Sequence, residues 1–341
     1  MEYPSLDTAK AGAIRFNTDS SQMEIYDGNQ WTGILGTSPE LHTGGGRGIF
    51  AGGDPSRTTN MDYINISTTG NSIDFGDYPI SNGTGTRGIV ASNTRGFIGG
   101  GESPSAGDSH NVIGKFEFAS TGSAIDFANL SWTSKGGAGL SNATRGIMTR
   151  GMGAPSLARN EIDFFTMASQ QDSADFGDVQ SGATYLGCGT ASPTRGIIVC
   201  GRDTGGQANI IEYITISTTG NAADFGDAVV TDNAVAGCVA GNATRGVFAG
   251  GGDSATPVVS YITYATLGNT TKFGDLHTGN GYQAPASDRI TLVTGGGTSP
   301  SNPTNRMDAV NISAGGTSTD FGDLTVSKTT MSGSSNAHGG L

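Results

Sequence analysis

The sequence predicts an all-β fold: a six-bladed β-propeller preceded by a small β-meander. Two observations predict the propeller. A pattern of about fifty residues recurs six times along the 341-residue chain, and each copy contains four short strand candidates separated by turn residues, as in one propeller blade. No stretch shows the apolar spacing of an amphipathic helix over three turns. The 57 glycines lie beside apolar runs at regular intervals, so we attribute them to backbone conformation rather than to disorder.

The clearest recurring motif is Asp-Phe-Gly-Asp, which we expect on the fourth strand of each blade. Its six Phe residues are spaced 52, 49, 49, 48 and 48 residues apart. We expect each Phe to fill the gap between neighbouring blades. The copies lie at Asp74–Asp77, Asp175–Asp178, Asp224–Asp227 and Asp320–Asp323, with degenerate copies at Asp126–Asn129 and Lys272–Asp275.

The second motif is Arg-Gly followed by apolar residues and, in most copies, a Gly pair. An alternating run such as Met61–Ile66 follows it and gives the third strand. Asn-Ala-Thr, at residues 142–144 and 242–244, is expected to join strands one and two in a tight hairpin, and Thr-Gly-Asn to join strands three and four. The copies begin at Arg47, Arg95, Arg145, Arg195 and Arg245, with an irregular sixth copy from Arg289. One set of four strand candidates is Val235–Gly241, Arg245–Gly250, Val258–Ala265 and Thr271–Leu276.

The C-terminus repeats a first-strand sequence. Residues Ser335–Gly340 resemble Ser141–Gly146, whereas the first copy of the repeat has only the Gly-rich segment Thr43–Gly46 before Arg47. We therefore expect a strand at about Thr329–His338 to complete the first blade. Such closure removes the open sheet edge that the ring would otherwise leave.

These repeats resemble the kelch motif. The shared features are four strands, an apolar run ending in Gly-Gly, an aromatic residue on strand four and another on strand three (Tyr63, Phe164, Tyr213 and Tyr261). The resemblance covers residues 41–341 and implies a kelch-like six-bladed propeller for that domain. The sequence departs from the family in having Phe where strand four usually has Trp.

Residues 1–40 lie outside the repeat and are expected to form a small meander. Apolar and polar residues alternate around two turns, at Thr18–Ser21 and Asp27–Asn29. So small a sheet is marginally stable alone, and its apolar side needs a partner surface. That partner is its own propeller, another copy of the chain or a different protein. The predicted partner-binding residues are Ile14, Phe16, Met23, Ile25 and Trp31.

The repeated polar residues are expected to be structural. We expect the recurring Arg and Asp to pair between strands or blades; calcium binding by the Asp pairs is the alternative, and it requires several oxygen ligands at one point. The four His share neither a repeat position nor a metal-ligand spacing, and no phosphate-binding loop or nucleophile elbow is present. We therefore expect no catalytic residues, no metal, no cofactor and no enzyme activity.

Charge and terminal sequence exclude other classes. The net charge of −12 disfavours a nucleic-acid partner. The first residues, Met1–Asp7, contain neither a basic stretch nor an apolar core, so we expect no signal peptide. The longest apolar run, Ile197–Cys200, is too short for membrane insertion. Cys188 and Cys238 occupy equivalent repeat positions and, with Cys200, are interpreted as small buried residues of a protein made in a reducing cytoplasm.

The stretch Gly12–Asp19 followed by Met23–Trp31 resembles a segment common in tail-fibre and other virion proteins of bacteriophages. The Thr-Arg-Gly and Asp-Phe-Gly-Asp repeats are similar to those of structural proteins of marine cyanobacterial phages. The resemblance implies a virion structural protein, a fibre or surface decoration module anchored by residues 1–40 to other virion proteins in many copies. Contact with host surface glycans belongs to this expectation. The alternatives are a glycan-binding host-recognition adhesin and, less favoured, a kelch-like carbohydrate-active enzyme. The variable loops lack the aromatic residues that favour an adhesin.

Overall fold

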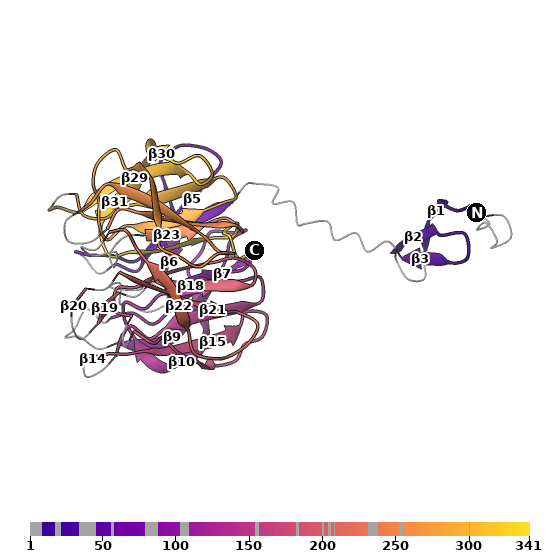
Figure 1. Ribbon diagram of the computed structural model, residues 1–341, viewed down its shortest axis with the longest axis horizontal. Helices are drawn as coiled ribbons and strands as arrows, with labels where there is room; N and C mark the ends of the chain where they lie inside the picture. Colours follow the sequence, from indigo (N-terminus) through magenta and orange to yellow (C-terminus); the bar gives the residue numbers. More distant parts are fainter. Residues whose placement is uncertain are drawn as a thin grey trace. The chain divides into compact units, whose positions relative to one another are not determined.

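The computed structural model describes residues 9–17, 22–33, 46–55, 58–78, 88–102, 109–153, 157–181, 184–199, 201–203, 206–207, 209–230, 238–251, 255–299 and 301–341. The described residues form strands and turns without an α-helix, so the fold is all-β. Within these residues, no helix has the length and apolar character to cross a membrane. The chain separates into two compact units, Met1–Thr43 and Gly44–Leu341 (Figure 1).

The first unit is a three-stranded antiparallel sheet with the order β1-β2-β3. The predicted meander is therefore present in the described part of residues 1–40. Asp27 begins the second turn by accepting hydrogen bonds from the backbone N–H groups of Asn29 and Gln30, at 2.7 and 2.8 Å. The strands are β1 (Ile14–Asn17), β2 (Gln22–Tyr26) and β3 (Trp31–Gly33).

The second unit contains six sheets of four antiparallel strands within its described residues, numbered here by the repeat that supplies strands two to four. The first sheet is β32 (Ser332–Ser335), β4 (Arg47–Ala51), β5 (Asn60–Asn65) and β6 (Ile73–Asp77). The second is β7 (Gly88–Ala91), β8 (Arg95–Gly99), β9 (His110–Glu117) and β10 (Ile125–Ser134). The third is β11 (Gly139–Ser141), β12 (Arg145–Thr149), β15 (Glu161–Thr166) and β16 (Ala174–Asp178).

The fourth to sixth sheets repeat the same order. The fourth is β17 (Cys188–Ala191), β18 (Arg195–Val199), β21 (Ile210–Thr215) and β22 (Ala223–Asp227). The fifth is β23 (Cys238–Gly241), β24 (Arg245–Ala249), β25 (Val258–Thr263) and β26 (Thr271–Asp275), extended by the short parallel strand β30 (Gly316–Thr317). The sixth is β27 (Ala284–Ser287), β28 (Thr291–Gly295), β29 (Thr304–Asn311) and β31 (Thr319–Lys328).

Two short hairpins lie in the connections between strands two and three. One pairs β13 (Met152–Gly153) with β14 (Leu157–Ala158), and the other pairs β19 (Arg202–Asp203) with β20 (Gly206–Gln207).

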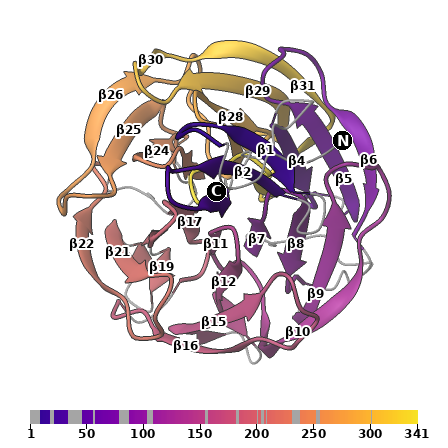
Figure 2. The same cartoon turned by 90° about the vertical axis from the view of Figure 1, so that its right-hand side faces the viewer.

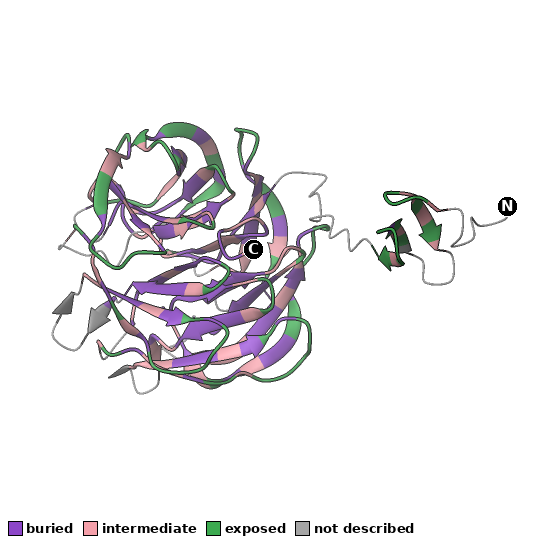
Figure 3. Cartoon of the chain, turned by 45° about the vertical axis from the view of Figure 1, so that its right-hand side comes forward, coloured by how far each residue is buried: buried purple, intermediate pink, exposed green. Residues whose placement is uncertain are grey.

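The six sheets contact one another in a closed cycle. Their first strands touch in the order β32, β7, β11, β17, β23, β27 and back to β32. In Figure 2 the first strands β7, β11 and β17 lie towards the middle of this unit, and the fourth strands β6, β10, β16, β22 and β26 lie at its rim. The apolar core is divided accordingly into six buried clusters, each between two successive sheets, and the last of them joins the sixth sheet to the first. Figure 3 shows that the strands of this unit are largely buried and that exposed residues lie mainly in turns and on parts of the outer strands.

The cycle is completed by the C-terminal strand. β32 pairs with β4 in the register Ser332↔Ala51 to Ser335↔Gly48, so the pairing of the two chain ends that the sequence predicted is present. One expectation for the sixth copy is wrong. Thr291, not Arg289, takes the position of the recurring Arg, because β28 begins at Thr291 and pairs it with Asn311 as Arg245 pairs with Thr263.

Each hairpin between strands one and two is fixed by a short polar side chain. Asn142 Oδ1 accepts hydrogen bonds from the backbone N–H groups of Thr144 and Arg145, at 3.0 and 2.9 Å. In the first sheet the two strands are not consecutive in the chain, yet Asn336 Oδ1 accepts the N–H of Arg47 at 2.7 Å. The side chain of Asn336 therefore replaces the covalent turn. The equivalent acceptors of Arg95, Arg195, Arg245 and Thr291 are Ser92, Ser192, Asn242 and Asp288.

Candidate functional site

The three-stranded sheet exposes four of its five predicted partner-binding side chains on one face. Ile14 lies opposite Ile25 and Phe16 lies opposite Met23 in the β1–β2 register. Directly opposed residues in an antiparallel pair point to the same face, as do residues two apart along one strand. Ile14, Phe16, Met23 and Ile25 are 59%, 52%, 44% and 37% exposed, respectively. Together they form a continuous apolar surface, named here the apolar face.

The fifth predicted residue, Trp31, belongs to the opposite face. β3 pairs Trp31 with Tyr26, whose side chain points away from Ile25. The two rings lie 5.4 Å apart, and the Arg15 guanidinium lies 4.3 Å from the Trp31 ring centre. The prediction that Trp31 shares the apolar side is therefore wrong. Trp31 stabilises the polar face of its own sheet instead.

Charged groups complete that polar face. Glu24 accepts hydrogen bonds from Asn17 Nδ2 at 2.9 Å and from Arg15 Nε at 2.7 Å. These two interactions lower the pKa of Glu24, Asn17 having the larger effect. One face of the sheet is thus polar and internally paired, whereas the other consists of the four apolar side chains and of Thr32, which lies opposite Ile25. The apolar face can bury surface against another protein.

The strand-four Phe residues lie between sheets, as the sequence predicted. Phe75, Phe127, Phe176, Phe225 and Phe321 belong to the buried clusters, and Phe273 packs against the cluster between the fifth and sixth sheets while staying partly exposed. In several sheets this Phe meets the strand-three aromatic ring edge to face, as Phe164 meets Phe176 at 5.9 Å between ring centres. These ring contacts join strands three and four within one sheet, while the strand-four Phe also packs against the neighbouring sheet in its buried cluster.

The recurring Arg residues bind backbone carbonyls rather than Asp. Arg145 donates from a terminal guanidinium nitrogen to the carbonyl of Ile216 in the next sheet at 2.9 Å, and its guanidinium lies 4.9 Å from the Phe164 ring centre. In the described part of the chain, none of these Arg residues forms an ion pair with an Asp of the Asp-Phe-Gly-Asp motif. The expected Arg–Asp pairing is therefore wrong. Arg47, Arg95, Arg195 and Arg245 reach the next sheet in the same way, at Phe118, Met167, Tyr264 and Ser313.

The Asp-Phe-Gly-Asp strands join sheets through their backbone. The carbonyls of Phe176 and Asp178 accept the N–H groups of Gly220 and Ala222 in the turn of the next sheet, at 2.7 and 2.8 Å. Gly177, between them, has a φ of +142°, and a Cβ there would lie 2.6 Å from the Gly220 carbonyl. Glycine is required by this close approach. We name this pair of backbone hydrogen bonds the seal.

Sequence reasoning missed a set of buried acids on strand three. Glu212 is 2% exposed and accepts the N–H groups of Gln180 and Ser181, which follow the fourth strand of the preceding sheet, at 2.9 and 2.7 Å. Asp163 accepts the N–H of Ser131 at 2.9 Å in the same way. The signal was present in the alternating runs, where an acid recurs at this position. In a strand with alternating apolar and polar residues, the polar residues are expected to face solvent. Strand three is buried on both faces, so its acids point into the interior instead.

A third buried acid, Asp62, lies near the buried Lys328 where the sixth sheet meets the first. Asp62 accepts a hydrogen bond from Thr325 Oγ1 at 2.7 Å, and Lys328 donates to Asn60 Oδ1. Desolvation raises the pKa of Asp62 and lowers the pKa of Lys328, while each charge partly offsets the shift of the other. The pair anchors the last strand of the sixth sheet to the first.

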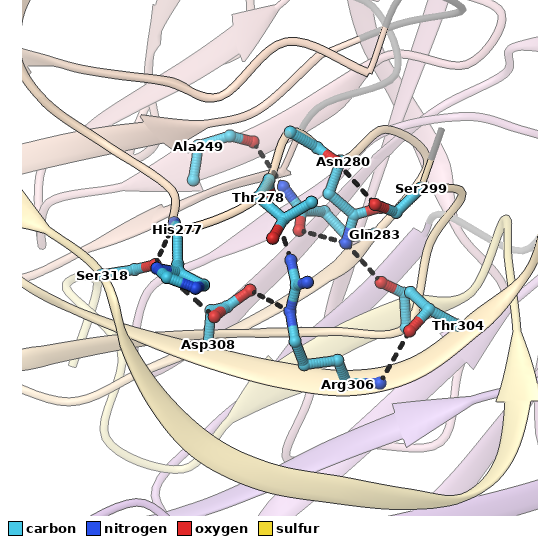
Figure 4. A network of polar contacts seen from close by, with 12 residues as sticks. Ala249, His277, Thr278, Asn280, Gln283, Ser299, Thr304, Arg306, Asp308 and Ser318 are labelled. Atoms are coloured by element: carbon cyan, nitrogen blue, oxygen red, sulfur yellow. Dashed lines mark hydrogen bonds and ion pairs between the residues drawn. The ribbon is translucent and has the colours of Figure 1, made fainter. Parts of the chain in front are cut away.

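A larger polar network lies between the fifth and sixth sheets (Figure 4). Arg306 donates from Nε to the buried Asp308 at 2.8 Å and from a terminal nitrogen to the Thr278 carbonyl at 3.1 Å. Asn280 and Gln283 are buried and bonded to each other at 3.1 Å. Gln283 also donates to the Ala249 carbonyl at 2.8 Å. These bonds satisfy groups within the fold and hold the two sheets in place.

The middle of the cycle offers little space. Residues of all six first strands line a cavity of about 30 Å³, and a second cavity of about 30 Å³ lies against Cys188 and Cys238. Each has room for water but not for a sugar or a cofactor. Both cysteines are buried reduced thiols.

The C-terminal residues cover one end of these first strands. His338 Nδ1 accepts the N–H of Gly340 at 3.1 Å, so its Nε2 carries the proton and donates to the Ala91 carbonyl at 3.0 Å. Desolvation lowers the pKa of His338 to about 4. A Cβ on Gly339 would lie 2.3 Å from the Asn242 carbonyl oxygen. The tail thus touches the second and fifth sheets and ties the cycle together.

Within the described residues, no three His, Cys, Asp or Glu side chains are grouped so as to hold a metal ion. Comparison with protein-family models and with curated proteins finds no match to this chain.

Proposed function

We propose that this chain is a structural protein of a bacteriophage particle, in which a kelch-like six-bladed propeller is carried by an N-terminal attachment segment. The observation that carries the proposal is the apolar face of a small separate sheet. Its four side chains are 37% to 59% exposed, although burying an apolar side chain contributes about 1.5–3 kcal/mol. A sheet of three short strands gains its stability by covering such a face with a partner.

Six sheets in cyclic contact support the propeller. Each holds four antiparallel strands, and the C-terminal strand joins the first. Four of the six fourth strands are only five residues long, and such short sheet edges suit a protein displayed on a particle surface. The virion location follows from the resemblance of the N-terminal segment and the repeats to phage structural proteins.

A structural role is favoured over an enzyme because the recurring side chains are used in packing. The recurring Phe, Arg and Gly join neighbouring sheets in most repeats, and the central cavities hold about 30 Å³ each. Ligand sites usually need about 300–1,000 Å³. The proposed partners are other virion proteins and further copies of this chain.

The test substitutes the apolar face and follows incorporation into particles. The double variant Ile14→Ser with Phe16→Ser should leave the melting temperature of the second unit unchanged but reduce the amount of chain on purified particles. The matched control is Ile290→Ser with Val326→Ser, which removes two exposed apolar side chains, 62% and 53% exposed, from the second unit. Undiminished incorporation of the first variant, or equal loss in the control, contradicts attachment through the apolar face.

A second function, contact with host glycans, is favoured by a hollow lined by polar residues at the junction between the second and third sheets.

A further inference from the structure

Four of the six junctions between sheets carry a complete seal. The carbonyls of Phe75 and Asp77 accept the N–H groups of Gly122 and Ala124 at 2.7 and 2.8 Å. The junctions from the third, fourth and sixth sheets repeat this pair of bonds at 2.7–2.9 Å. The junction from the fifth sheet is closed differently, by pairing of Gly274 with Gly316 in parallel strands and by the bond from Ser318 N–H to the Asp275 carbonyl at 2.9 Å.

The junction between the second and third sheets departs from this pattern. Ala128 stands where the strand has glycine elsewhere, and Gln171 stands where the turn has glycine. A Cβ at the equivalent glycine, Gly177, would lie 2.6 Å from the opposing backbone, so Ala128 forces the turn away. The bond from Ser173 N–H to the Asn129 carbonyl remains at 2.9 Å. Its companion, from Gln171 N–H to the Phe127 carbonyl, is not among the hydrogen bonds of these described residues.

The missing contact leaves a notch at the outer edge of the ring. Its volume is about 470 Å³, and it is lined by Asp126–Asn129 of β10 and by Gln170–Asp172 of the turn. The notch is a shallow hollow open to solvent on its outer side, and its volume is comparable to the range of about 300–1,000 Å³ that small-molecule sites occupy. Asp126, Gln170, Gln171 and Asp172 are exposed, so a ligand reaches them without any movement of the sheets.

The lining groups define the kind of ligand. The two carboxylates accept hydrogen bonds, whereas the amides of Gln170 and Gln171 both donate and accept. Asp172 is already held in position, because its Oδ1 accepts the Asn129 N–H at 2.9 Å. Two negative charges disfavour phosphate and other anions. Phe127 and Ala128 are buried, so the notch offers little apolar surface to a lipid.

We propose that this notch binds a neutral saccharide. Sugar hydroxyl groups donate to carboxylates and accept from amides at the same time, which matches the mixed set of groups around the notch. The inference rests on the proposed function only for the source of the sugar, a host surface glycan. The shape and chemistry of the notch are properties of the second unit alone.

The experiment is calorimetric titration of the purified full chain with three neutral trisaccharides, maltotriose, mannotriose and triacetylchitotriose, each taken to millimolar concentration. We expect at least one trisaccharide to bind. Asp126→Ala should weaken that binding at least tenfold. Asp175→Ala, the equivalent exposed residue at a sealed junction, should leave it unchanged. The double variant Ala128→Gly with Gln171→Gly restores both glycines of the seal, so it should abolish binding and keep or raise the melting temperature.

Three results would overturn the proposal: no trisaccharide binds, Asp126→Ala and Asp175→Ala behave alike, or the double-glycine variant still binds. A titration with Ca²⁺ alone serves as the rival arm. Calcium binding that is lost in Asp126→Ala, without sugar binding, would also overturn it. Incorporation of the same variants into particles is scored separately. Lost sugar binding with normal incorporation bears on the notch alone, whereas failed incorporation of the apolar-face variant bears on the attachment role.

Discussion

Removing the C-terminal strand should destabilise the entire second unit. Deletion of Thr329–Leu341 takes away β32, which pairs four residues with β4. It also removes Met331, which is 2% exposed, and Asn336, whose Oδ1 accepts the Arg47 N–H at 2.7 Å. Phe50 and Ile49 on β4, which are 1% and 0% exposed, then lie on an open sheet edge.

The expected loss is large compared with the stability of a domain. Loss of the β32 ladder and of the Asn336 bonds costs about 1 kcal/mol for each hydrogen bond. Loss of the buried Met331 adds about 2 kcal/mol. About four such hydrogen bonds together with Met331 bring the total to roughly 6 kcal/mol. The usual folding free energy of a domain is about 5–15 kcal/mol. The truncated chain should therefore be unfolded or melt far below the full chain.

Scanning calorimetry of the full and truncated chains measures this directly. Deletion of residues 1–40 is the matched control, because it removes a segment from the other end of the chain and should leave the main transition in place. The single substitution Asn336→Ala perturbs the same closure by a smaller amount. It loses the bond to Arg47 and a bond of 3.3 Å to the Asn93 carbonyl, a cost of about 2 kcal/mol. A C-terminally truncated chain that melts like the full one would refute the closure of the cycle by β32.

Three further outcomes are expected. First, because His338 has its pKa lowered from 6.5 to about 4, stability should be fully present above pH 6.5 and be lost as pH falls from 6.5 through about 4. The free energy of unfolding should fall by about 3 kcal/mol over this range. Urea unfolding at several pH values measures this fall, and His338→Gln should remove that part of the pH dependence. Second, Phe176→Ala should lower the free energy of unfolding in urea by about 3–5 kcal/mol. Phe273→Ala should lower it clearly less, because Phe273 is only partly buried. Equal losses would contradict this difference in packing. Third, Gly177→Ala should lower the melting temperature, because its Cβ would lie 2.6 Å from the Gly220 carbonyl, whereas Ser217→Ala, at an exposed position in the turn of the next sheet, should change it little.

Much of the fold follows from the sequence because its repeat fixes the strands. The six Phe residues mark the fourth strands, and the likeness of Ser335–Gly340 to Ser141–Gly146 indicates the pairing of β32 with β4. Local patterns and repeated turns suffice for these features, since each depends on residues near one another in the chain or at equivalent repeat positions.

The missed features depend on partners that a sequence pattern does not display. The Arg145 guanidinium binds a backbone carbonyl, which every residue possesses, so no partner residue could be recognised. The sequence pattern places Trp31 on the apolar side only if β3 continues the alternation of β2. The turn after Tyr26 instead places Trp31 opposite Tyr26. The notch forms because glycine is replaced at two positions, Ala128 and Gln171, that face each other across a junction between sheets. The sequence alone does not show that these two positions meet.

The most direct test of the proposed role is the fate of a chain that lacks residues 1–40. Quantitative mass spectrometry of purified phage particles should find the full chain on the particle and the truncated chain only in the free fraction. Calorimetry should show the truncated chain to be folded, because the second unit contains its own six sheets and six buried clusters. A folded, truncated chain that still joins particles in normal amount would contradict attachment through the N-terminal sheet.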